Sequence, residues 1–230
     1  YGEKSGELYL LTEHISGSHI VKDSTAVRVN AYLHIIKFLK SQKNIKKSSI
    51  AKRGPLFWLS MLPFITLRAI FRNPPQTIMI IQAFWKIISA IPELLLRRKK
   101  GIIHRDLSDY NVLKKERSLY LLDLQLVCLA DPLIDYAVLY YGYSNNKDFI
   151  QTLEGTAEFR EITANKSSKK ALFAYMYIFA LYELSLKAHA RELVTDFFGN
   201  KPKQVDQPII RSKFKTWILP ILLIIVATLV

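Results

Sequence analysis

The spacing of apolar residues predicts a mainly helical chain. The first helix follows Asp23 and Ser24, which can cap it, and its apolar positions recur at roughly helical spacing: Val27, Ala31, Ile35, Phe38 and Leu39. A long apolar helix is predicted over residues 76–96, with a kink near its end at Pro92. Another helix is predicted from Asp135, and after a polar loop a long amphipathic helix over residues 169–193.

One apolar stretch, residues 56–71, allows two interpretations. It reads LFWLSMLPFITLRAIF and ends at Asn73-Pro74-Pro75. Pro63 and Arg68 interrupt it, and it is shorter than the ~20 residues that a membrane-spanning helix needs. A core helix is the default, and an interfacial helix is the alternative.

Short strands are predicted around the middle of the chain. Residues 7–15 form a strand that runs into a Ser/Gly turn, 101–113 a strand and loop, and 118–124 the second strand of a hairpin. Cys128 lies in an apolar, strand-like run and is expected to be an inert core thiol. It is the single cysteine, which excludes an internal disulfide or a Cys-rich zinc site.

The formal net charge of +14 is unevenly distributed. No acidic residue occurs between Asp23 and Glu93, whereas eleven basic residues do, and Arg97-Arg98-Lys99-Lys100 follows shortly afterwards. Such a field suits anionic lipid, nucleic acid or a phosphorylated substrate. A solvated basic face explains the charge equally well.

The end of the sequence indicates a membrane attachment. Residues 216–230 carry no charge, and five basic residues precede them, as expected of a cytoplasmic flank: Lys201, Lys203, Arg211, Lys213 and Lys215. With the apolar stretch and the acid-free basic region, this run favours the cytoplasmic face of a membrane, with peripheral binding or a C-terminal anchor. The alternative is a buried C-terminal helix.

The strongest chemical signal is His104-Arg105-Asp106-Leu107-Ser108-Asp109-Tyr110-Asn111, followed by Leu121-Leu122-Asp123. Phosphoryl transfer needs a carboxylate near the attacking hydroxyl and oxygen ligands for magnesium. An Asp with an Asn five positions later on one loop supplies both, and a hairpin returns a second carboxylate. Asp106 is therefore the candidate base, and Asn111 and Asp123 are the candidate magnesium ligands.

These residues resemble the protein-kinase-like superfamily, and within it the aminoglycoside and choline phosphotransferases and the lipopolysaccharide sugar kinases. The resemblance covers approximately residues 8–143 and is specific over 101–137. It implies an α+β C-terminal lobe, mainly helical with a small catalytic hairpin, and ATP and Mg2+ as cofactors. Residues 10–17 resemble the hinge strand, so Glu13, His14 and Ile15 would bind adenine through the backbone.

The resemblance also assigns positioning roles. Residues 130–137 (ADPLIDYA) are similar to a G-D-P-x-x-D-L-A segment, in which Asp135 would begin a buried helix and hydrogen-bond the catalytic loop. His104 would pack and orient the backbone.

Some residues depart from the patterns of these families. Leu124-Gln125 follows Asp123 where protein kinases have Phe-Gly, and no A-P-E segment occurs, which argues against an ordinary protein kinase. Arg105 is the choice of protein kinases, and the lipopolysaccharide sugar kinases also tolerate it. The glycine-rich loop and its Lys are absent and are expected upstream of Tyr1, so these 230 residues alone are expected to be inactive.

The predicted organisation has three parts: the end of an N-lobe and hinge over 1–17, a kinase-like C-lobe over 18–200 with an apolar insert near 48–75, and a basic linker with an apolar segment over 201–230. The expected function is transfer of the γ-phosphate of ATP to a hydroxyl of a sugar, lipid or other small acceptor at an anionic membrane, with no nucleic acid as partner. The alternatives are an atypical Ser/Thr protein kinase and an inactive membrane-associated pseudokinase scaffold.

Overall fold

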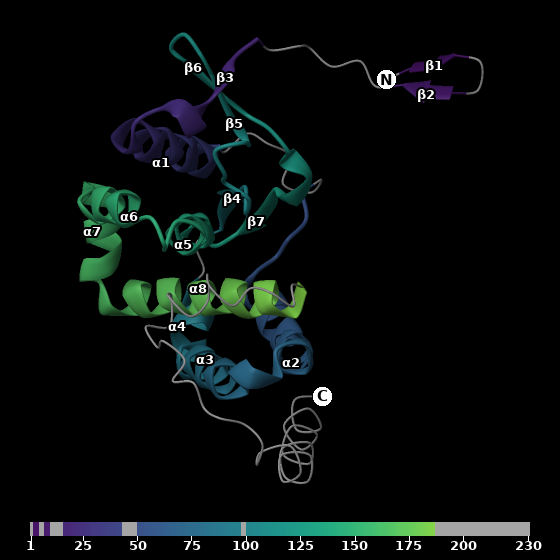
Figure 1. Ribbon diagram of the computed structural model, residues 1–230, viewed down its shortest axis with the longest axis vertical. Helices are drawn as coiled ribbons and strands as arrows, with labels where there is room; N and C mark the ends of the chain where they lie inside the picture. Colours follow the sequence, from purple (N-terminus) through teal and green to yellow (C-terminus); the bar gives the residue numbers. More distant parts are fainter. Residues whose placement is uncertain (1, 5–6, 10–15, 43–49, 98–99, 187–230) are drawn as a thin grey trace.

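The computed structural model describes residues 2–4, 7–9, 16–42, 50–97 and 100–186 (Figure 1). The helices are α1 (Thr25–Ser41), α2 (Pro55–Arg72), α3 (Thr77–Ser89), α4 (Ile91–Leu96), α5 (Leu133–Gly142), α6 (Lys147–Glu154), α7 (Ala157–Ala164) and α8 (Lys166–Leu186). The strands are β1 (Gly2–Lys4), β2 (Glu7–Tyr9), β3 (Ser18–His19), β4 (Gly101–Ile103), β5 (Val112–Lys115), β6 (Ser118–Leu121) and β7 (Cys128–Ala130). This mostly helical architecture with small sheets confirms the predicted α+β class.

Helix α8 forms the centre of the hydrophobic core. It packs against α5 on one side and against α2, α3 and α4 on the other (Figure 1). Its buried positions occur on almost every turn and include Leu172, Tyr175, Met176 and Leu181, each at most 1% exposed. A helix that is apolar nearly all round is stable only when neighbours cover it on opposite sides, which explains the layered arrangement.

Two small sheets hold the loop that contains Asp106. Strands β3, β5 and β6 form one antiparallel sheet, and β4 pairs antiparallel with β7 in another. The predicted hairpin is confirmed: β5 and β6 pair with Val112 opposite Leu121 and Lys115 opposite Ser118. β4 and β7 are completely buried, so the loop that follows β4 starts from a fixed point in the core.

Helix α1 forms where the apolar spacing predicted a helix. Ser24 is its N-cap residue, but the Ser24 side chain makes no capping hydrogen bond. The buried side includes Val29, Tyr32 and Ile36, whereas Val27 and Phe38, two of the apolar positions that predicted the helix, are 40% and 57% exposed. The apolar residues surround most of the helix, so the packing partners decide which side is buried.

The helix predicted over residues 76–96 is broken in two. α3 ends at Ser89, Ala90 takes a non-helical conformation, and α4 begins at Ile91 with Pro92 in its first turn. Proline is tolerated in the first turn because the amide it lacks has no helical partner there. The predicted kink is therefore a boundary between two helices.

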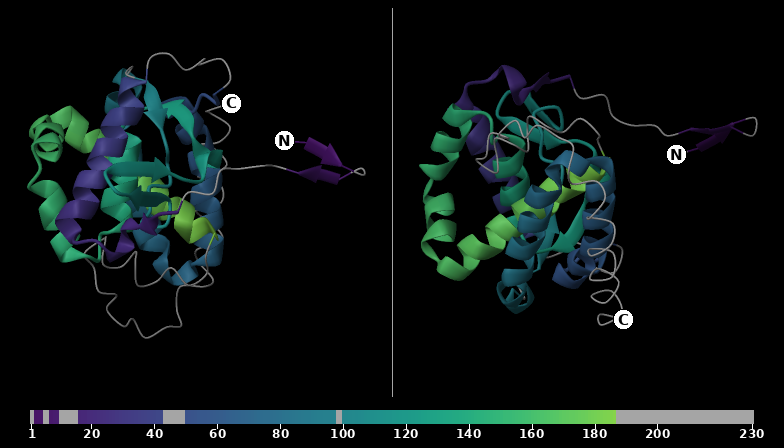
Figure 2. Two further views of the ribbon diagram at one scale, coloured as in Figure 1. Left: turned by 90° about the horizontal axis from the view of Figure 1, so that it is seen from above. Right: turned by 60° about the horizontal axis from the view of Figure 1, so that its bottom comes forward.

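Helices α6 and α7 were not predicted, and they lie at one side of the molecule beside α1 (Figure 2). Each has eight residues and an N-cap side chain, of Asn146 or Thr156, that accepts a hydrogen bond from the amide three positions later. Helices this short depend on tertiary packing, here by the buried Phe149 and Phe159.

Candidate active site

Asp135 fixes the start of the loop that follows β4. Its carboxylate accepts hydrogen bonds from the backbone amides of His104, at 3.1 Å, and Arg105, at 2.8 Å. The Asp135 side chain lies in the first turn of α5 and is 1% exposed. Its predicted structural role is confirmed. Burial raises the pKa of Asp135 to about 6, while the two amide hydrogen bonds act in the opposite direction.

His104 connects the loop to the hairpin. Its Nε2 lies 2.9 Å from the carbonyl oxygen of Leu122, and its ring is completely buried. Because a carbonyl only accepts, Nε2 carries the proton and donates it to this bond. Leu122 immediately precedes Asp123, so His104 holds the backbone at that position, in agreement with its predicted role as a packing residue.

Asp106 and Asn111 are in direct contact. Nδ2 of Asn111 donates to the Asp106 carbonyl at 2.8 Å and to Asp106 Oδ2 at 3.0 Å. Both side chains are partly exposed at the surface of the loop. Because the Asn111 amide nitrogen is engaged on this side, its oxygen is left for another ligand, and Asp106 keeps a second carboxylate oxygen.

The hairpin register brings Asp123 back to the same loop. The amide of Leu122 donates to the carbonyl of Asn111 at 2.8 Å, which continues the β5–β6 ladder by one residue. Asp123 follows directly, is exposed, and has left-handed backbone angles (φ 52°, ψ 68°). Non-glycine residues in this region are strained and concentrate at functional sites. No short-range sequence signal indicates this conformation.

The residues present fit a magnesium ion bound together with nucleotide phosphates. Asn111 and Asp123 offer amide and carboxylate oxygens, the ligand types that magnesium prefers, and the Asp123 carboxylate makes no hydrogen bond within the described part of the chain. No group of three or more His, Cys, Asp or Glu among the described residues could hold a metal by itself. A shared site with phosphate oxygens is consistent with this small donor set.

Arg105 is held by a residue that the sequence did not indicate. Its guanidinium lies over the ring of Trp58, in the first turn of α2, at 4.8 Å from the ring centre. Arg105 Nε and Nη1 are buried without a hydrogen-bond partner in the described residues, and burial lowers the pKa of Arg105, while the electron-rich ring and the nearby Cys128 favour its charge. The Arg105 backbone is also left-handed, with φ 73°. Helix α2 thereby contacts the loop that contains Asp106 directly.

The far end of the loop is anchored by Asp109, which also was not predicted. Asp109 pairs with the guanidinium of Arg28, whose Nε lies at 2.9 Å, and accepts from the hydroxyl of Tyr32 at 2.7 Å. Tyr32 in turn contacts the hydroxyl of Tyr143 at 2.8 Å. Asp109 is 7% exposed, so this network ties the loop to α1 and to the end of α5. The only sequence signal was an Asp within an otherwise recognisable loop.

Asp131, which follows β7, is a third buried carboxylate, after Asp135 and Asp109. It pairs with Arg97 and accepts from the amide of Leu133 at 3.1 Å.

Cys128 is buried and, as predicted, lies in the core, where burial raises the pKa of its thiol. The predicted adenine-binding residues Glu13, His14 and Ile15 lie outside the described residues.

Comparisons with known proteins agree with the fold. A family model described as "Phosphotransferase enzyme family" matches residues 1–165. A solved structure of spectinomycin phosphotransferase in complex with ADP and spectinomycin shares the fold, with a TM-score of 0.54 and 14% sequence identity. The alignment covers 83% of this chain and 62% of that one. No curated protein matches the chain. Because the family model matches well over half of the sequence, the chain belongs to the phosphotransferase enzyme family, within the protein-kinase-like superfamily.

Proposed function

We propose that this protein transfers the γ-phosphate of ATP to a hydroxyl of a small acceptor, with Asp106 as the base and with Asn111 and Asp123 as magnesium ligands. The observation that carries the proposal is the contact between Asn111 Nδ2 and Asp106 Oδ2, on a loop whose hairpin returns Asp123. The family, and the ADP and spectinomycin bound by its structural relative, support a nucleotide and a small-molecule acceptor.

In this mechanism Asp106 acts on the acceptor. Asn111 holds Oδ2, so the other carboxylate oxygen receives the hydrogen of the acceptor hydroxyl. As the acceptor oxygen bonds to the γ-phosphorus, the proton passes to Asp106 and the bond to the leaving ADP oxygen breaks. A bound Mg2+ would neutralise the charge on the phosphate oxygens. Asn111 Oδ1 and the Asp123 carboxylate would hold that ion. The hydrogen bonds of Asp135 to the loop backbone and of His104 to the Leu122 carbonyl keep the loop and the hairpin in position.

The proposal includes a location at the cytoplasmic face of a membrane, with a sugar or lipid as acceptor. The support is the apolar segment 216–230, which lies outside the described residues, and the basic flank before it. Leu124-Gln125 after Asp123 supports a small acceptor over a protein substrate, because the Phe-Gly that follows this Asp in switchable protein kinases is absent.

The test is the substitution Asp106→Asn in the full-length protein. It keeps the side-chain shape and an oxygen that accepts from Asn111, but it removes the proton acceptor. Phosphoryl transfer should fall by roughly 10²–10⁴-fold while nucleotide binding persists. Asp148→Asn, the same chemical change at an exposed position on α6, is the control and should leave transfer unchanged. Near wild-type turnover in Asp106→Asn would refute the assignment, and a parent protein that binds nucleotide but never transfers phosphate would indicate the inactive scaffold.

A further inference from the structure

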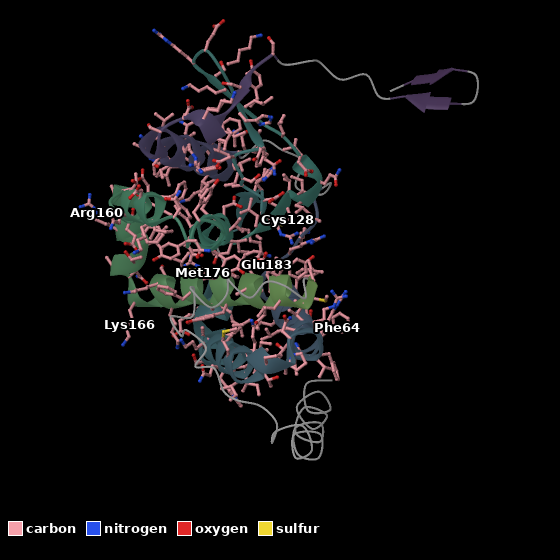
Figure 3. All side chains as sticks on the ribbon, in the orientation of Figure 1. Phe64, Cys128, Arg160, Lys166, Met176 and Glu183 are labelled. Carbon is pink, nitrogen blue, oxygen red and sulfur yellow. The ribbon has the colours of Figure 1, made fainter. Side chains whose placement is uncertain are left out.

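Helix α2 has a buried side and an exposed side, and both contain large apolar residues. Its inner side, with Trp58, Leu62, Ile65 and Ala69, is at most 4% exposed and packs toward α8. The outer side repeats at helical spacing with exposed residues: Phe57, Met61, Phe64, Arg68 and Phe71. Phe64 and Phe71 are 60% and 69% exposed. Phe64 projects from the edge of the molecule (Figure 3).

The neighbouring helix α3 also carries exposed apolar residues. α3 packs beside α2, and its exposed residues include Ile78, at 65%, and Trp85, at 57%. Phe64, Leu67 and Phe71 also line a shallow hollow together with Arg68 and Arg72. Exposed apolar groups concentrated on adjacent helices mark a binding surface. We call this surface, formed by the outer sides of α2 and α3, the α2–α3 face.

Charge selects the partner of this face. Arg68 lies among the exposed aromatic residues, and Arg72 lines the same hollow while its Nη1 donates to the Leu186 carbonyl. Lys86 on α3 donates to the hydroxyl of Tyr177 and so is directed toward α8. No acidic residue occurs anywhere between Asp23 and Glu93. Bulky apolar side chains with basic residues beside them are characteristic of helices that lie in the interface of an anionic bilayer. We therefore propose that the α2–α3 face docks onto an anionic lipid bilayer.

Helix α2 lies on the bilayer in this proposal and does not cross it. Within the described part of the chain it is the one helix long and apolar enough to span a membrane, but 28% of its residues are buried in the protein. Those residues form the stripe that packs on α8, so inserting α2 across a bilayer would break the core. Both sequence-based interpretations of residues 56–71 therefore apply in this proposal. The inner side of α2 is part of the core, and its outer side is interfacial.

The contact between Trp58 and Arg105 places the catalytic loop close to the docked surface. Trp58 contacts the guanidinium of Arg105, the residue that precedes Asp106 in the sequence. Leu56 and Phe57, which precede Trp58, are exposed. The loop then stands roughly one helix diameter, ~10 Å, from residues that enter the membrane. This geometry favours an acceptor whose hydroxyl belongs to a lipid headgroup, an inference that rests on the proposed function.

The test uses the 230-residue chain, whose one cysteine, Cys128, is buried. Phe64→Cys, labelled with an environment-sensitive fluorophore, reports on the α2–α3 face, because Cys128 is buried and does not compete for the label. Phe71→Cys is a second reporter on the same face. Arg160→Cys, an exposed position on α7 at the opposite side of the molecule, is the control (Figure 3). The probe is a vesicle of phosphatidylcholine and phosphatidylglycerol in equal parts, with pure phosphatidylcholine for comparison.

On anionic vesicles the labels at positions 64 and 71 should shift to shorter emission wavelength and lose their quenching by iodide, and the label at 160 should do neither. Vesicles of phosphatidylcholine alone should give a smaller shift. Flotation without any change at 64 and 71 would overturn the proposal, since another segment would then hold the protein. Protection at these positions that depends on protein concentration without vesicles would also overturn it, in favour of a second copy. Phosphoryl transfer by the full-length parent and its Asp106→Asn variant, measured without vesicles, tests the proposed function separately.

Discussion

Asn111 donates its side-chain amide to the carboxylate of Asp106 across 3.0 Å, so the candidate base and a candidate magnesium ligand form one hydrogen-bonded unit. The orientation of Asn111 follows from this bond: Nδ2 faces Asp106, and Oδ1 is left for the metal. A second bond, from Nδ2 to the Asp106 carbonyl at 2.8 Å, closes the loop between these two residues, which are five positions apart in the sequence.

Removing either candidate ligand should weaken nucleotide binding only when magnesium is present. Asn111→Ala and Asp123→Ala each remove one oxygen, and contacts to charged groups contribute about 1.5–3 kcal/mol, so affinity should fall by roughly tenfold or more. Titration of a fluorescent ATP analogue with and without Mg2+ measures the effect, with Asp148→Ala as the control. If both variants bind the analogue as the parent does, the loop is only structural.

Asp135 should make folding stability depend on pH. Its pKa is about 6 in the folded protein and near the ordinary 3.8 when unfolded. The contribution is therefore fully present below pH ~4 and is lost as the pH rises through ~6, on the order of 2–3 kcal/mol in total. Asp135→Asn does not titrate, so the difference in unfolding free energy between parent and variant should change in this window.

Urea unfolding at several pH values between 4 and 7 measures that difference. Glu93 and Glu158, whose pKa values are lowered by hydrogen bonds from Lys170 and Lys37, add an opposite slope, but they are present in both proteins and cancel. A constant difference across the window would contradict the assignment of the slope to Asp135.

The pair of Arg28 and Asp109 should be a major stabilising contact. Its side chains are only 12% and 10% exposed, so Asp109→Ala leaves a buried cation without its partner, which costs about 3–5 kcal/mol. The matched control is Asp23→Ala, which removes the partner of Lys114 from a pair that is 39% and 29% exposed and should cost less than about 1 kcal/mol. Equal losses for the two variants in urea unfolding would show that the network around Tyr32 does not depend on Asp109.

Removal of residues 217–230 should change how the protein binds membranes. Each basic residue near an anionic surface contributes ~1 kcal/mol, and salt screens this attraction, whereas an apolar anchor is insensitive to salt. The shortened protein should float with anionic liposomes in low salt and dissociate in high salt, and the intact protein should stay bound in both. An intact protein that remains unbound in low salt would refute membrane attachment.

The sequence by itself determined the candidate catalytic loop, the hairpin and most of the long helices. These features depend on short-range spacing: Asp106 and Asn111 are five residues apart, and β5 and β6 are joined by a tight turn. The apolar period likewise marks α2 and α8, because a long amphipathic or apolar pattern has few alternative structures. Even Asp135 could be assigned, since its role follows a local segment that resembles known phosphotransferases.

Only the tertiary structure decided which distant residues hold that loop in place. Arg28 is 81 residues from Asp109, and Trp58 reaches Arg105 from another helix, so no local pattern encodes either contact. The same holds for the two sides of α2: its sequence is apolar all round, and packing against α8 determines that Leu62 is buried and Phe64 exposed. Which apolar residues are buried is decided only when the core is assembled. The apolar residues of α2 that stay exposed are the basis of the proposed partner outside the protein.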